Sequence, residues 1–304
     1  MASSFTVRPA RLDDLPAVHD IWYRDEVADD PQPPAKGPVL SGFAYEAEHG
    51  TMRVAENSEG ALIGFGASVR WAGPRGELTY LVDLFIDEHT QSHGVGQALL
   101  GALPLRDGAC CVHASRDPRA AALYIRWGMR PLWPNLWLVA DPDWGARGLS
   151  TLPGADLDIV EAAPDDPELA AWDTRSFGFA RPDDLAWLVE QRDAQPLWFR
   201  RGGRTVGYGY VQRKCLESLW RPEAATIGPI GAATPDDACD CVCAATRWAV
   251  ERAGVARLGI PGPHPALTPL IEAGCRIVYN ETFLASEGAP LPDMTRYLPG
   301  GVFL

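Results

Sequence analysis

The sequence lacks the features that mark membrane, secreted and nucleic-acid-binding proteins. No stretch approaches the roughly 20 consecutive apolar residues of a membrane span, and the N-terminus has no apolar core of signal-peptide length. Positive charge is scarce, because 27 Lys and Arg stand against 40 Asp and Glu, giving a formal net charge of -13. Since this charge repels nucleic acids and anionic membranes, we expect neither as a partner and favour a cationic substrate.

Cysteine is too scarce for a disulfide framework. There are seven cysteines, an odd number, and two of them are adjacent, so we expect a reduced, cytoplasmic protein. The alternating cysteines of the stretch 239–243 could bind a soft metal, but a zinc site needs four ligands, commonly in separated pairs. Cys215, Cys275 and His264 stand apart. On a helix, Cys241 would lie on an apolar stripe, so we expect core packing and no metal.

The sequence instead contains an internal repeat of about 150 residues. Three pairs of segments match in the same order: Val7–Asp14 with Ile159–Asp166, Gly64–Gly66 with Gly207–Gly209, and Ala120–Gly128 with Ala266–Gly274. The stretch 140–156 between the copies is rich in Gly and Pro, as linkers often are. We therefore predict tandem domains at 1–143 and 157–304, joined by a linker at 144–156.

Within the first copy, hydrophobic periodicity and turn residues predict a mixed α/β domain built on a largely antiparallel sheet. Strands are expected at 5–8, 53–56, 62–71, 78–86, 110–113 and 132–140, and helices at 12–24, 43–49, 94–103 and 119–127. The Pro- and Gly-rich stretch 29–42 is expected to be a loop.

A glycine-rich turn joins the central strand at 78–86 to the following helix. Gln91 is followed by Gly94 and Gly96, so backbone N–H groups at the positive end of a helix are left uncovered, and phosphate groups bind such sites. Neither a dinucleotide fingerprint nor a P-loop fits, because Leu99 replaces the third glycine and Gly-Lys-Ser/Thr is absent. Taken alone, the turn could equally be a tight connection between a strand and a helix.

A second motif follows, in which Asp117 precedes a helix that carries Tyr124 four residues before Gly128. Together the two motifs resemble the GNAT superfamily of acetyl-CoA-dependent N-acetyltransferases. That family has Gln/Arg-x-x-Gly-x-Gly/Ala for the cofactor diphosphate, then Asn-x-x-Ala-x-x-Leu-Tyr. The resemblance covers about residues 5–140. It implies an α/β (α+β) fold of two tandem GNAT-like domains, each a mixed, mainly antiparallel sheet flanked by helices.

The resemblance also implies roles for individual residues. Backbone groups of Leu84, Phe85 and Ile86 would pair with the pantetheine arm of acetyl-CoA, and Tyr124 would protonate the leaving thiolate. The cofactor would further be held by Gln91, Ser92, His93, Gly94, Val95, Gly96, Gln97, Asp117 and Ala120. His93 and Asp117 depart from the pattern, where Arg or Lys and Asn are usual.

Acetyl transfer requires a neutral amine, although alkylamines with a pKa of ~10.4 are protonated at pH 7. A nearby carboxylate can accept that proton, and Asp83 is the best-placed acid, unless it is merely a hydrogen-bonded strand residue. Val82 stands where polyamine acetyltransferases carry a second acid. In the first two helices, which line the acceptor pocket in GNAT enzymes, the candidates are Trp22, Tyr23 and Glu46, with Asp25, Glu26 and His49 weaker. A solvated helix face is the alternative for these residues.

The second copy lacks the glycine turn. Thr234 and Pro235 would begin a helix whose first turn already holds two acids, and Leu270 occupies the place of Tyr124. We therefore expect a degenerate domain and one acetyl-CoA per chain. The sequence predicts an N-acetyltransferase acting on a primary amine of a small molecule, as a monomer with tandem domains or a homodimer. A protein acetylase and a non-catalytic acetyl-CoA sensor, whose second domain contacts a partner, are the alternatives.

Overall fold

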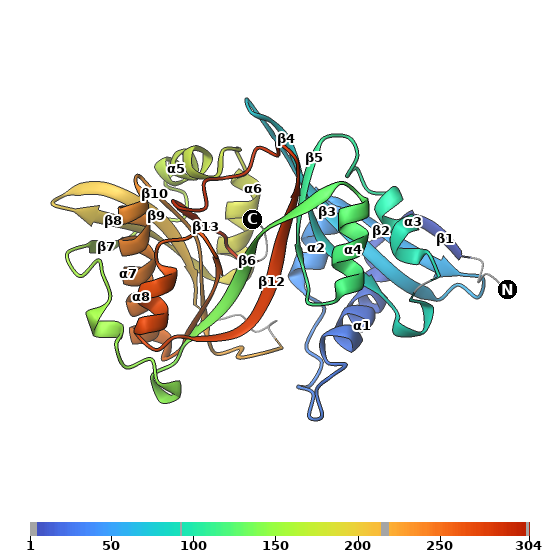
Figure 1. Cartoon of the computed structure of the whole chain (residues 1–304), viewed down its shortest axis with the longest axis horizontal. Helices are drawn as coiled ribbons and strands as arrows, with labels where there is room; N and C mark the ends of the chain where they lie inside the picture. Colours follow the sequence, from blue (N-terminus) through green and yellow to red (C-terminus); the bar gives the residue numbers. More distant parts are fainter. Residues whose placement is uncertain (1–4, 92, 214–218, 302–303) are drawn as a thin grey trace.

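The computed structural model describes residues 5–91, 93–213, 219–301 and 304, and it places the two halves of the chain side by side (Figure 1). The first half contains β1 (Phe5–Pro9), α1 (Leu15–Glu26), α2 (Ser41–His49), β2 (Thr51–Asn57), β3 (Leu62–Gly73), β4 (Gly76–Ile86), α3 (Val95–Gly101), β5 (Ala109–Ala114), α4 (Pro118–Arg126) and β6 (Met129–Ala140). The predicted elements of this half are present, with ends shifted by a few residues. The largest shifts, of three residues, are at the start of β6 and at the start of α1, where a 3-10 turn at Leu12–Asp14 precedes the helix.

The second half repeats this order after two short 3-10 turns, Pro142–Trp144 and Leu149–Thr151. It contains β7 (Asp158–Glu161), α5 (Pro167–Phe177), α6 (Pro182–Arg192), β8 (Ala194–Arg201), β9 (Arg204–Gln212), β10 (Ala225–Ala232), α7 (Pro235–Ala253), β11 (Ala256–Pro261), α8 (Leu267–Glu272), β12 (Arg276–Ser286) and β13 (Tyr297–Leu298). Cys241 and Cys243 belong to α7 and are buried in the core, as the apolar stripe indicated for Cys241. Cys215 lies outside the described residues.

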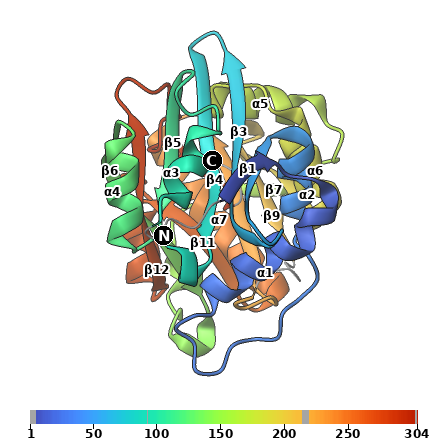
Figure 2. The same ribbon diagram turned by 90° about the vertical axis from the view of Figure 1, so that its right-hand side faces the viewer.

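All strands belong to one mixed sheet with the order β1-β2-β3-β4-β5-β12-β6-β11-β10-β9-β8-β7, and β13 pairs with β10. In the first half, α3 and α4 cover one face of the sheet while α1 and α2 cover the other (Figure 2). The predicted fold class, a tandem α/β protein with a mixed and mainly antiparallel sheet, is therefore confirmed, with the addition that the two halves share a single sheet.

The sharing arises because the halves exchange two long strands, β6 and β12. β12 pairs with β5 of the first half, and β6 pairs with β11 of the second half. β6 and β12 also pair antiparallel with each other at the centre of the sheet. The domain boundaries at 143 and 157 stay a prediction. The two segments that they separate each contribute one strand to the part of the sheet formed by the other.

Buried aromatic residues from both halves fill the space between α2, β3 and α6. Asp184 of α6 accepts a hydrogen bond of 2.6 Å from the Tyr45 hydroxyl and one of 2.8 Å from Trp71 Nε1. Hydrogen bonds to a buried carboxylate contribute about 1.5–3 kcal/mol each. They fix α2, which carries a predicted site residue, against the second half.

In the described part of the chain, no helix is long and apolar enough to cross a membrane.

Candidate active site

The central feature of the first half is a bulge in β4. The register of β4 with β3 shifts between Leu81, which faces Ser68, and Asp83, which faces Ala67. Val82 is therefore the extra residue, and a bulge of this kind re-aims the side chains that follow it. After the bulge, Leu84 packs in the cluster beneath α4, whereas Phe85 packs toward α1 and α2.

β4 also separates from its parallel neighbour β5. The described pairing of these two strands runs over Leu78–Leu81, so the rest of β4 presents an open edge on that side. Leu84, Phe85 and Ile86, the residues predicted to pair with pantetheine, lie on this edge. The carbonyl oxygen of Ile86 accepts a hydrogen bond of 3.2 Å from Gln91 Nε2, which ties the predicted phosphate loop to the strand.

The glycine turn starts α3 without a side-chain cap. Gly94 has φ +86°, a left-handed conformation that favours glycine, and an added Cβ there would meet nothing within 4 Å. At Gly96 an added Cβ would lie 3.3 Å from Ile86 Cδ1, so the loop can approach β4 closely because this residue is glycine. The N–H groups of the first turn of α3 therefore remain available to an anion.

The remaining loop residues have different surroundings. Val95 is buried and anchors α3, while Gln97 is exposed. The exposed His93 folds back, with Nδ1 2.9 Å from the Gln91 carbonyl oxygen. Ser92 lies outside the described residues.

Helix α4 holds the predicted proton donor. Asp117 caps the helix by accepting a hydrogen bond of 2.8 Å from the Arg119 N–H, as expected of an acid at this position. Tyr124 is 5% exposed and packs near Leu84, with Ala120 partly buried against the same cluster. Burial, and after it the charges of Asp83 and Asp117, raise the pKa of Tyr124, so the phenol keeps its proton at neutral pH.

Two acids meet on the opposite face of β4. Glu46 of α2 is 2% exposed, and its carboxyl group lies within hydrogen-bonding reach of that of Asp83. Burial, followed by the charge of Asp83, raises the pKa of Glu46 well above its usual range. Burial raises the pKa of Asp83 to about 6, and the hydrogen bond from Glu46 limits this rise. Glu46 is therefore the member of the pair that keeps its proton, and Asp83 is the member that ionises.

The other predicted acceptor residues have packing partners. Trp22 stacks on His19 at 5.5 Å between ring centroids and meets Phe43 edge-on at 6.1 Å. The Tyr23 hydroxyl donates a hydrogen bond of 2.7 Å to the Pro34 carbonyl oxygen and so holds the connection between α1 and α2. Their contact with an acceptor stays a prediction.

Two further acids were not among the leading candidates. Solvent reaches Glu26 at the end of α1, yet desolvation by surrounding protein raises its pKa to about 7, with Asp25, Asp83 and Glu281 adding to the rise. Glu281 belongs to β12, in the second half of the sequence. No motif marks it, because only the strand exchange brings it beside the first half.

The second half repeats the bulge and the strand pairing of β4, but it lacks the residues of the candidate site. β10 also bulges, between Ile227 and Ile230, and pairs with β11 only at its start in the described chain. The internal repeat places Pro229 where Asp83 stands in the first half, and Leu270 is fully buried. β13, near the end of the chain, pairs with β10 at Ile230 and Gly231 and so occupies the edge that is open in β4.

Thr234 caps α7, as expected, by accepting a hydrogen bond of 3.1 Å from the Asp237 N–H. Among the described residues, no group of three or more His, Cys, Asp and Glu side chains is placed to hold a metal ion.

No protein-family model and no curated protein matches the sequence. Solved structures match its fold. An acetyltransferase-like protein from Pyrococcus horikoshii is similar over 99% of this chain and 96% of its own, with a TM-score of 0.71 and 17% identity. A tandem GNAT protein from the clavulanic acid biosynthesis pathway is similar over 94% of this chain and 99% of its own, with a TM-score of 0.60 and 14% identity. This chain has the tandem GNAT fold.

A GCN5-related glucosamine N-acetyltransferase region of a fungal multi-domain β-N-acetylglucosaminidase is also similar, over 94% of this chain, with a TM-score of 0.68 and 18% identity. The chain spans 38% of the length of that fungal protein. The GNAT fold agrees with the resemblance drawn from the glycine turn and the Tyr124 helix.

Proposed function

We propose that this chain is an acetyl-CoA-dependent N-acetyltransferase that acts on a primary amine of a small molecule. The observation that carries the proposal is the pair of neighbouring carboxyl groups, Asp83 and Glu46, beside the open edge of β4. A cationic amine is attracted to such a pair, and an ionised carboxylate with a pKa near 6 can take its proton.

The first half fits acetyl-CoA at two places. The open edge at Leu84, Phe85 and Ile86 suits the pantetheine arm, and the uncapped start of α3 beside Gly94 and Gly96 suits the diphosphate. When bound there, acetyl-CoA supplies an acetyl group activated as a thioester. The second half offers no such edge in its described residues, because β13 already pairs with β10.

The protein's own residues then divide the proton transfers. Asp83 removes a proton from the bound ammonium and leaves a nucleophilic amine. Glu46 keeps its own proton and, by donating it in a hydrogen bond, keeps Asp83 ionised near neutral pH. Tyr124, protonated and packed near Leu84 on the other face of β4, donates a proton to the leaving sulfur. Positioned acids and bases of this kind contribute about 10²–10⁴-fold to a rate.

The test is a panel of amines incubated with acetyl-CoA while the release of free thiol is followed. We expect turnover of at least one small cationic amine, and an Asp83→Asn variant should lose most of it. Glu88→Gln, a change at an exposed carboxylate after β4, is the matched control and should leave the rate unchanged.

Lysine peptides belong in the same panel, because turnover of peptides alone would favour a protein acetylase. Calorimetric binding of acetyl-CoA without thiol release from any amine would contradict an enzyme and favour a sensor.

A further inference from the structure

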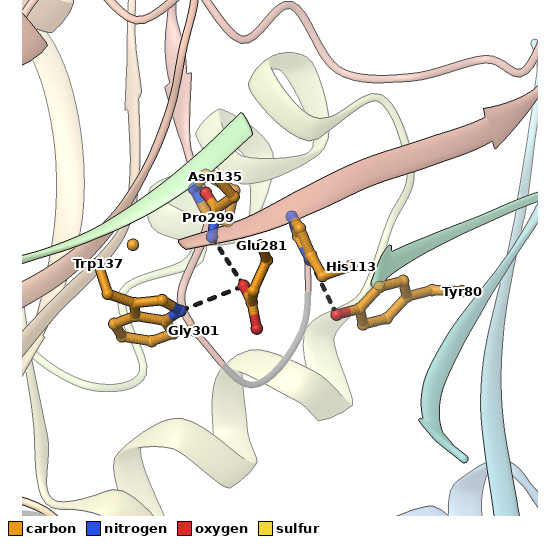
Figure 3. A pocket seen from close by; sticks show the side chains of 8 residues that line it. Tyr80, His113, Asn135, Trp137, Glu281, Pro299 and Gly301 are labelled. Carbon is orange, nitrogen blue, oxygen red and sulfur yellow. Dashed lines mark hydrogen bonds between the residues drawn. The ribbon is translucent and has the colours of Figure 1, made fainter. Parts of the chain in front are cut away.

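A small cavity lies where the exchanged strands meet, beside the acceptor face of β4. It has a volume of about 50 Å³. Its walls include Tyr80 of β4, His113 of β5, Asn135 and Trp137 of β6, and Glu281 of β12 (Figure 3). Since about 10–15 Å³ is enough for one water molecule, the cavity can hold a small polar group.

Glu281 is held through one of its two carboxylate oxygens. Oε2 accepts a hydrogen bond of 3.1 Å from Asn135 Nδ2 and one of 3.2 Å from Trp137 Nε1 (Figure 3). In the described part of the chain, Oε1 accepts no hydrogen bond and Glu281 makes no ion pair. A largely desolvated carboxylate is costly unless a cation is paired with it.

The cavity walls supply no such cation among the described residues. Burial lowers the pKa of His113 to about 4, so the imidazole is neutral at pH 7. Its Nδ1 lies 3.1 Å from the Tyr80 hydroxyl. Burial raises the pKa of Tyr80, so the hydroxyl stays protonated and donates a hydrogen bond to His113. Glu281 therefore has no counter-charge from these two neighbours.

A second, independent observation points to the kind of ligand. Asn135 is 4% exposed, and its Oδ1 atom is buried without a hydrogen-bond partner among the described residues. Among the described residues, Asn135 Oδ1 is buried without a hydrogen bond and Glu281 Oε1 accepts none, and both atoms are acceptors. An ammonium group has three donors and no acceptor, so it matches these atoms in both charge and hydrogen bonding.

The cavity also adjoins the proposed acceptor site. Tyr80 lies just before the bulge in β4, and the charges of Glu281, Asp83 and Glu46 all act on its hydroxyl. Glu26 likewise lies within the fields of both Asp83 and Glu281. Because Tyr80 and Glu281 line the same cavity and Asp83 is three residues after Tyr80 on β4, a short acceptor can extend from one carboxylate to the other.

We propose that Glu281 and Asn135, brought to the first half by the strand exchange, form a second cation subsite that selects acceptors with two amino groups. One amino group is acetylated at Asp83, while the other remains an ammonium ion in the cavity. This inference rests on the proposed function for the identity of the first group, but the subsite itself can be tested by binding alone.

The test compares α,ω-diamines, from diaminopropane to diaminohexane, with the n-alkylamines of the same chain lengths. Binding is measured by calorimetry in the presence of coenzyme A, which has no acetyl group to transfer, and kcat/KM is measured with acetyl-CoA. We expect the best diamine to exceed its matched monoamine by about 10–100-fold, the range of one charge-assisted hydrogen-bonded contact. Glu281→Gln should abolish this preference without changing monoamine binding.

Glu287→Gln, at an exposed position just after β12, is the control and should keep the preference. If the Glu281→Gln variant does not fold, Asn135→Leu removes the other acceptor at similar volume and should reduce diamine binding. Equal binding of diamines and monoamines, no binding of any amine, or a preference that survives Glu281→Gln would overturn the subsite. Diamine binding that depends on Glu281, without acetylation of any amine, would uphold the subsite and refute the proposed function.

Discussion

Replacing Glu46 by leucine tests how the two carboxyl groups share the work of the base. Glu46→Leu removes the proton donor that stabilises ionised Asp83, and it leaves a side chain suited to a buried position. The pKa of Asp83 should therefore rise above about 6. Because only ionised Asp83 can accept a proton, activity is lost as the pH falls through this pKa. The variant should lose activity at a higher pH than the wild type.

The size of the shift follows from the lost hydrogen bond. A hydrogen bond to a charged group contributes about 1.5 kcal/mol at the low end of its range, and one pKa unit corresponds to about 1.4 kcal/mol. The acid limb of the profile of kcat/KM against pH should then move to higher pH by about one unit. At about pH 6, ionised Asp83 would fall from roughly one-half to roughly one-tenth, so kcat/KM drops about fivefold. Above about pH 8 the two proteins should be equally active.

The measurement is kcat/KM against pH for an amine found in the panel, with the same amine for every protein so that its own titration cancels. Glu46→Gln is the matched control, because its amide N–H still donates to Asp83 and should keep the limb near the wild-type position. If Glu46→Leu and Glu46→Gln give the same profile as the wild type, Glu46 does not tune Asp83 and the reasoning fails.

Three further results are expected. Tyr124→Phe should bind acetyl-CoA with unchanged affinity by calorimetry but turn over ~10²–10⁴-fold more slowly; an unchanged rate would remove Tyr124 as the proton donor. Gly94→Trp should abolish acetyl-CoA binding in a folded protein, because its side chain would cover the uncapped start of α3. Gly94→Asn, which tolerates the same left-handed backbone, should still bind, and equal affinities for both variants would refute this site. Calorimetric titration should give one acetyl-CoA per chain, because β13 occupies the edge of β10; two equivalent sites would contradict it.

Short-range features of the site could be predicted from the sequence because they depend on neighbouring residues. The strand at 78–86, the turn through Gly94 and Gly96 and the helix that carries Tyr124 were each indicated by local patterns, and the structure contains all three elements. The cap formed by Asp117 also follows from one residue and its helix. Their assignment to acetyl-CoA binding and catalysis stays a prediction.

The internal repeat showed that two similar units exist but not how they join. Exchanged strands have the same hydrophobic pattern as strands that stay in their own half, so the sequence could not distinguish the two arrangements. The structure shows that β6 and β12 change places and merge both halves into one sheet.

The chemistry of the acids also depended on the tertiary structure. Asp83 was identified as the base from its position in the strand, whereas its contact with Glu46 depends on how α2 packs against β2 and β3, the neighbours of β4 in the sheet order. Glu281 carried no signal at all, because its place beside Tyr80 results from the strand exchange. Local sequence determined the turn and the helices, while long-range packing decided which carboxyl groups lose water together, and that loss of solvation sets their pKa values.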